Sequence, residues 1–380
     1  MGITRFFRGQ VNLLLKRCNI LAGRLSSIRK KLQPEIEAYI GKVVVELDSL
    51  QYDLEQLLND PDFGSNYLLK NQIQQYRRYS EILNIIEVEH ITVLDQYNDR
   101  DYYLYCFLKI FCQQTGYPEK PPLVSTHSTD SFFVDLSSEI IHLPLCEDCF
   151  LLAIPDLIHE LGHLFYDRNS IEIEQSFNTH LNKHIDKEKN KAEDEGSSKS
   201  YQKKFNSLKK VWMQEYIIEF FCDIFATYLV GTAYAWSHLR LILESNDQIY
   251  YPGFGKDSTH PADEARMRAI LITIEELQGS KSTKIIAERW EAFKTQVFNR
   301  QQETEYVYCY PDSLLVQLAK IVINLCQRNN LVPYYQHFQT DNNLPLIMQQ
   351  AWIEFHNNPQ LYPDWETKKI EKIRADINIE

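Results

Sequence analysis

The segment DLIHELGHLFYD, residues 156–167, decides how the rest of the chain is interpreted. Its apolar residues recur three and four positions apart, which predicts a helix seated against a hydrophobic core. His159 and His163 share another face of that helix, one turn apart, so both imidazoles can reach one metal ion. Glu160 follows His159 directly on the helix and can contact a water bound to the metal. The segment therefore predicts a metal-binding helix.

Gly162 lies in the interior of this predicted helix, where glycine costs about 1 kcal/mol relative to alanine. A second helix that crosses closely at this position would compensate for the cost. The chain repeats the histidine spacing at His180 and His184, but Leu181 stands where the glutamate would be. The hydrophilic surroundings of this second pair favour a solvated helix face.

A zinc site needs a third protein ligand, and a catalytic site leaves the fourth position open. The segment WMQEYIIEFFCDIFATYLVG, residues 212–231, places Glu215, Glu219 and Asp223 at intervals of four. This spacing stacks three acidic side chains on one face of an apolar helix, and acidic residues are rarely buried without a partner. The segment therefore predicts that a cation lies beside this helix.

The motif H-E-x-x-H followed by E-x-x-x-D on a later helix resembles the gluzincin class of zinc metallopeptidases. By that resemblance Glu219 is the third zinc ligand, and Asp223 orients His159 or His163 through a hydrogen bond. An alternative register uses Glu215 as the ligand with Glu219 behind it. Both registers predict a zinc ion, Zn2+, as the cofactor.

The segment STHPADEARMRAI, residues 258–270, is similar to the corresponding part of the M48 branch, which includes the CAAX prenyl endopeptidases. The resemblance implies that His260 donates a hydrogen bond to the developing oxyanion. It also implies that Arg266 pairs with a carboxylate of the metal helix or with substrate. Without the resemblance, the His-Pro pair is a turn that enters a helix. The similarity covers residues of about 125 to 278, and Cys222 departs from it where alanine is frequent.

Most of the remaining sequence has a helical pattern, with one β-like patch. Residues 131–136, SFFVDL, and 139–145, EIIHLPL, are rich in β-branched and aromatic residues and predict a hairpin. We expect an α+β fold, mostly α, with a zincin-like core and a small antiparallel sheet. The expected regions are an N-terminal helical region (1–116), a metallopeptidase core (117–280) with a charged insertion (171–210), and a C-terminal helical region (281–380).

Charge and composition bear on location and partners. The formal net charge of −12 gives no support for a nucleic acid or an anionic membrane as partner. The apolar segment 216–236 could span a bilayer by length, but Glu219 and Asp223 would be costly there, so a buried helix explains it better. Scattered cysteines and the lack of a secretory signal pattern favour a cytoplasmic location.

The sequence thus predicts a zinc-dependent endopeptidase that acts on a protein or peptide substrate. Zinc would lower the pKa of a water and polarise the scissile carbonyl, while Glu160 moves the proton. In gluzincins an edge strand before the metal helix aligns an extended peptide, so the predicted hairpin is the expected substrate ledge.

Two alternatives stay open: a non-catalytic helical scaffold with a structural zinc site, and hydrolysis of a non-peptide amide. An intact Glu160 argues against the scaffold, because a structural zinc does not need that carboxylate. The flanking helical regions are large enough to bind a regulatory protein partner.

Overall fold

The computed structural model describes residues 3–65, 67–128, 131–145, 147–194, 199–244, 249–250, 260–297, 304–338 and 342–377. The chain divides into two compact units, Met1–Asp99 and Arg100–Glu380. Helix α5 (Asp99–Thr115), which we expected in the N-terminal region, contributes its apolar side chains to the core of the second unit. The insertion expected at 171–210 includes residues 195–198, which lie outside the described part.

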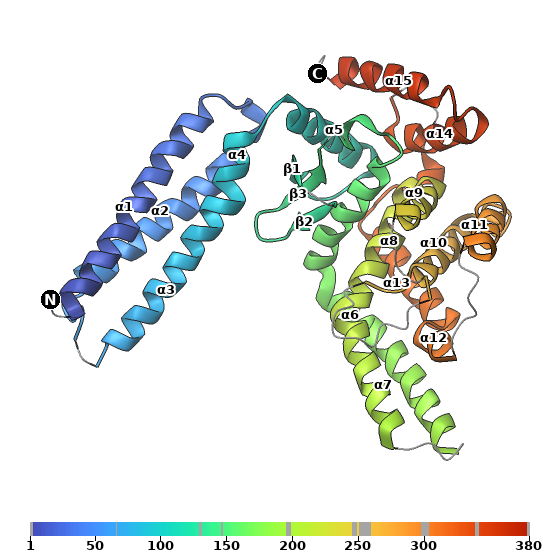
Figure 1. Ribbon diagram of the computed structural model, residues 1–380, viewed down its shortest axis with the longest axis horizontal. Helices are drawn as coiled ribbons and strands as arrows, with labels where there is room; N and C mark the ends of the chain where they lie inside the picture. Colours follow the sequence, from blue (N-terminus) through green and yellow to red (C-terminus); the bar gives the residue numbers. More distant parts are fainter. Residues whose placement is uncertain are drawn as a thin grey trace. The chain divides into compact units, whose positions relative to one another are not determined.

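Three long helices dominate the first unit (Figure 1): α1 (Ile3–Arg29), α2 (Glu37–Asn59) and α3 (Leu69–Ile85). Shorter elements connect or follow them: η1 (Pro34–Ile36), the π-helical turn η2 (Ile86–Ile91) and α4 (Thr92–Gln96). The buried residues of α1 recur every three or four positions from Phe7 to Ile28, so one apolar stripe of α1 faces its neighbours.

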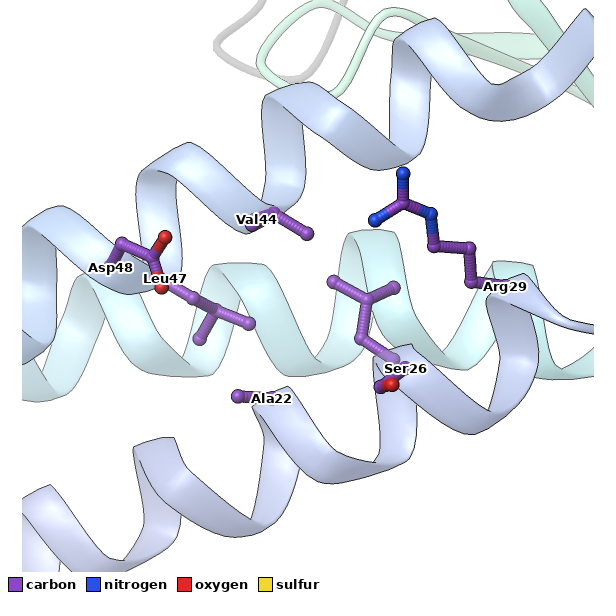
Figure 2. Close-up of a pocket in the computed structure, with 7 residues that line it drawn as sticks. Ala22, Ser26, Arg29, Val44, Leu47 and Asp48 are labelled. Carbon is purple, nitrogen blue, oxygen red and sulfur yellow. The ribbon is translucent and has the colours of Figure 1, made fainter.

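A pocket of about 190 Å³ lies between α1 and α2 (Figure 2). The small side chains of Ala22 and Ser26 leave this space on α1, and Val44 and Leu47 line it from α2. None of the candidate catalytic or metal-binding residues lines this pocket, so we assign it no part in the centre described below.

The second unit is built around α8 (Ile217–Val230), which is buried along nearly its whole length. Helices α6 (Ile154–Asp194), α10 (Asp263–Gln278) and α13 (Asp312–Arg328) pack against it. The other helical elements are η3 (Glu147–Cys149), α7 (Lys199–Val211), η4 (Trp212–Tyr216), α9 (Thr232–Glu244), α11 (Lys284–Val297), α12 (Thr304–Cys309), η5 (Tyr334–Gln336), α14 (Leu344–Asn357) and α15 (Tyr362–Ile377). One hydrophobic core joins the helices before and after residue 281.

A three-stranded sheet adjoins α6, with strands β1 (Leu123–Ser128), β2 (Phe133–Asp135) and β3 (Ile140–Pro144) in the order β1-β3-β2. The predicted hairpin is confirmed, because β2 pairs antiparallel with β3. The expectation of a purely antiparallel sheet is wrong, because β1 pairs parallel with β3. The sequence of β1 gives only a weak strand signal, because polar residues occupy buried positions in it. Asp101 of α5 accepts hydrogen bonds from the Thr126 N–H and hydroxyl at 2.7 and 2.8 Å.

The apolar segment 216–236 forms two helices. Gly231 ends α8 with a φ of 61°, and α9 begins at the next residue. A Cβ at Gly231 would lie 2.5 Å from the ring of Tyr334, so packing also requires glycine there. Among the described residues, no helix combines the length and the apolar character that a membrane crossing needs.

The close approach expected at Gly162 is confirmed. A Cβ on this glycine would lie 3.1 Å from Cα of Cys222 and 3.2 Å from the ring of Phe225, so α6 and α8 touch here with no room for a side chain. Because Cys222 Cα belongs to the backbone of a buried helix, it cannot move aside as the end of a flexible side chain would.

We expect Gly162→Ala to lower the free energy of unfolding. Alanine favours a helix by about 1 kcal/mol, but overpacking a close helix contact costs about 1–3 kcal/mol and would force α6 away from α8. Gly23→Ala on α1 is the matched control, because no atom outside the adjoining backbone of its own helix lies within 4 Å of its Cβ position, and it should stabilise its helix. Urea unfolding measures both variants, and equal stabilisation by the two changes would contradict the close contact.

Candidate metal centre

Helices α6 and α8 bring the three predicted ligands together. His159 and His163 lie one turn apart on α6, and Glu219 lies in the first turn of α8. Glu219 Oε2 is 3.5 Å from His159 Nε2, and Glu219 Oε1 is 3.7 Å from His163 Nε2. Pro155 stands in the first turn of α6, where its missing N–H is harmless. One carboxylate therefore faces both imidazoles.

This donor set fits a divalent metal ion. Glu219 Oε2 is buried and has no hydrogen-bond partner, although it faces the Nε2 atom of His159. Imidazole nitrogens and a carboxylate oxygen are zinc ligands, and two ligand atoms about 2.0 Å from one zinc ion stand roughly 3.3 Å apart at a tetrahedral angle. The distances found here are close to that separation, and a cation would satisfy the lone carboxylate oxygen.

Cys222 is a further donor near the histidines, and in the sequence it stands out only because alanine is frequent at that position of the M48 branch. One ligand atom from each of His159, His163 and Cys222 lies within 4.8 Å of the other two. Glu219 lines the pocket described below, whereas Cys222 is fully buried and is not among the residues that line it. A metal bound by the two histidines and the glutamate would thus lie at the pocket, whereas the thiol would bind a metal from the side of the core.

Asp223 lies one turn after Glu219 and contacts His159 from the side away from that glutamate. Asp223 Oδ1 is 3.1 Å from His159 Nδ1. Arg266 of α10 donates two hydrogen bonds to the Asp223 carboxylate, from Nε at 2.8 Å and from Nη2 at 2.7 Å. Arg266 therefore pairs with a carboxylate of α8, the helix that carries Glu219.

Burial and charge set the protonation of the centre. Burial acts to lower the pKa of His159, but Asp223 and Glu219 outweigh it and raise that pKa to about 10. Burial acts to raise the pKa of Glu219, but the neighbouring His159, Arg266 and His260 outweigh it and lower that pKa to about 2. Burial and the charge of His159 lower the pKa of His163 to about 4. The carboxylates thus stabilise a positive charge at this point, which a metal ion would supply.

A pocket of about 300 Å³ opens over the centre. Its lining includes His159, Glu160, Glu219 and His260. Glu160 Oε2 lies 3.9 Å from His163 Nε2, and burial raises the pKa of Glu160 to about 7. His260 Nε2 lies 3.7 Å from Glu219 Oε2, and 61% of the His260 side chain is exposed. Both predicted catalytic side chains therefore border the pocket beside the candidate ligand atoms.

The sheet contributes to the same pocket, but not through the strand expected. Strand β3 directly precedes η3 and α6, yet β1 and β2 flank it on both sides, so β3 is not an edge strand. Strand β2 pairs with β3 alone within the described residues. Ser131 and Phe132, just before β2, line the pocket together with Pro144 at the end of β3. Of the two edge strands of this sheet, β1 and β2, it is therefore β2 that lies next to the pocket.

For two acidic residues near the centre, the structure differs from what the sequence indicated. Glu215 lies in the π-helical turn η4 and does not line the pocket. A π turn has more residues than an α turn, so the spacing of four does not place Glu215 in line with Glu219. Asp156, which the sequence did not single out, forms part of the pocket wall. It accepts hydrogen bonds from Arg240 Nη2 at 2.8 Å and Ser237 Oγ at 2.9 Å.

Comparisons of the chain with models of known protein families, with characterised proteins and with solved structures found no match. The resemblance to gluzincins therefore stays a prediction. The functional assignment rests on the chemistry and geometry of the centre itself.

Proposed function

We propose that this protein is a zinc-dependent endopeptidase with a gluzincin-type, zincin-like centre. One observation carries the proposal. The buried Glu219 carboxylate, with one oxygen free of hydrogen bonds, faces the Nε2 atoms of His159 and His163. Glu160 lies beside them at the pocket. A metal site next to a carboxylate base and open to a pocket is what metal-assisted hydrolysis requires.

In this proposal His159, His163 and Glu219 hold the metal. The chemistry that zinc supplies at such a site is Lewis acidity, which lowers the pKa of water and polarises a carbonyl. Glu160 accepts a proton from the attacking water on a carboxylate oxygen and later gives it to the leaving amine. His260 donates a hydrogen bond from Nε2 to the oxyanion that forms at the scissile carbonyl.

The substrate we propose is an extended peptide of a protein. Strand β2 pairs on one side only within the described residues, so its other edge can form backbone hydrogen bonds with an added strand. Ser131 and Phe132 precede β2 and line the pocket, which connects this edge to the metal centre. A peptide bound along β2 would thus extend into the pocket that Glu160 lines.

A second candidate function is a helical scaffold with a structural zinc, and Cys222 is the observation that favours it. A fourth protein ligand closes a zinc site, and structural sites are closed in this way. Binding through Cys222 would leave no position for water. The carboxylate of Glu160 would then have no role at the pocket.

Proteomic mapping of cleavage sites decides between these functions. Wild-type protein and Glu160→Gln are each incubated with a denatured proteome, and zinc content is measured on the same samples. The proposal predicts new peptide termini with the wild type alone, lost on addition of a chelator. A zinc-loaded wild type that produces no new termini would favour the scaffold.

A further inference from the structure

We infer that Tyr234 is a positioning residue that fixes the tautomer of the metal ligand His159. The inference rests on the proposed metal site and extends it to a residue of α9. Tyr234 is 1% exposed, and its ring lies nearly parallel to the His159 imidazole, at 13° with centroids 5.8 Å apart. Such packing holds the tyrosine hydroxyl in one place.

The hydroxyl contacts two groups of the centre at once. Tyr234 donates to Asp223 Oδ1 at 2.5 Å, and its oxygen is 2.8 Å from His159 Nδ1. The Asp223 carboxylate can only accept, and it also receives both Arg266 hydrogen bonds. The single hydroxyl proton of Tyr234 is therefore directed to Asp223.

Because the hydroxyl proton points to Asp223, it determines which tautomer His159 adopts. Since the Tyr234 oxygen has given its proton to the bond with Asp223, it can only accept from the imidazole. His159 Nδ1 must then carry a hydrogen, so a metal that replaces the other ring proton finds the lone pair at Nε2. Nε2 is the atom that faces Glu219 Oε2 at 3.5 Å. The hydrogen-bond chain from Arg266 to His159 thus prepares Nε2 for a metal.

Other buried tyrosines of the same core do not share this arrangement. The Tyr228 hydroxyl of α8 donates to the Leu331 carbonyl oxygen at 3.0 Å, and the Tyr166 hydroxyl of α6 donates to Glu174 at 3.1 Å. Tyr228→Phe therefore removes a buried hydroxyl and its hydrogen bond without touching His159, which makes it a matched control.

The test compares wild type, Tyr234→Phe and Tyr228→Phe in two measurements. The first is zinc affinity, obtained by competition with a chelator of known affinity. Loss of a group that orients a ligating histidine costs about 10–100-fold in affinity. We expect about 10-fold for Tyr234→Phe, because Asp223 Oδ1 still lies 3.1 Å from Nδ1. The second is the His159 Nδ1–H signal in NMR spectra of the zinc-loaded, 15N-labelled protein, expected to shift or exchange faster in Tyr234→Phe alone.

The outcomes are distinguishable. If wild type binds zinc and Tyr234→Phe binds it equally well with an unchanged Nδ1–H signal, Tyr234 does not position His159. If both phenylalanine variants lose affinity equally, the effect is one of general packing, and the inference is overturned. If wild type itself binds no zinc, the proposed function fails, and the inference falls with it.

Discussion

Glu160→Gln is expected to abolish peptide cleavage while the protein keeps its zinc. Glutamine has nearly the shape of glutamate but cannot accept the proton of the attacking water. General acid–base groups contribute about 10²–10⁴-fold to rate, so cleavage should fall at least about 100-fold. Zinc content should not change, because Glu160 Oε2 lies 3.9 Å from His163 Nε2 and is not one of the proposed ligands. Peptide cleavage rates and metal analysis of the same preparations measure the two effects.

Glu172→Gln is the matched control for this change. Glu172 lies on the same helix, α6, but its side chain is 50% exposed and pairs with Arg328 away from the pocket. The Glu172→Gln variant should cleave peptides at the wild-type rate. Undiminished cleavage by Glu160→Gln would remove this residue from the mechanism, and loss of zinc from it would mean that it acts as a ligand.

Glu219→Ala is expected to lose zinc, whereas Cys222→Ala keeps it. Loss of a residue that hydrogen-bonds a metal ligand already lowers metal affinity by about 10–100-fold. Loss of the ligand itself should therefore lower it by more than about 100-fold. Cys222 is buried outside the pocket lining, and in the proposed site it is not a ligand. The two variants therefore separate the two donor sets that the structure offers.

Zinc affinity and the increase of melting temperature on adding zinc measure this prediction, since a ligand that binds the folded state raises its stability. Wild type and Cys222→Ala should both show the increase, and Glu219→Ala should not. Loss of zinc from both variants would identify the closed, structural site with four protein ligands, and loss from Cys222→Ala alone would make the thiol the third ligand in place of the carboxylate.

The sequence carried enough information to place the helix of His159 and His163 and its close contact with a second helix. The spacing of His159 and His163 sets them on one face whatever the surroundings are, because it follows from helix geometry. Gly162 indicated a crossing helix, since glycine in a helix interior needs a compensating contact. The crossing at Cys222 supplies it. Local rules were sufficient for these features.

Features that depend on distant parts of the chain could not be predicted. Strand β1 buries Thr126 only because Asp101, 25 residues earlier, accepts its hydrogen bonds. At the break between α8 and α9, the ring of Tyr334, from far along the chain, fills the space where a side chain of Gly231 would lie. That break turns α9 so that Tyr234 meets His159, a contact that no spacing rule indicates.

X-ray absorption at the zinc edge of the purified protein tests the central claim most directly: one zinc ion bound by two imidazoles and the Glu219 carboxylate. The account predicts one zinc per chain with nitrogen and oxygen ligands alone, at about 2.0–2.2 Å. A sulfur ligand at about 2.3 Å would place Cys222 in the site and close it. That result, or a protein that holds no zinc, would contradict the account.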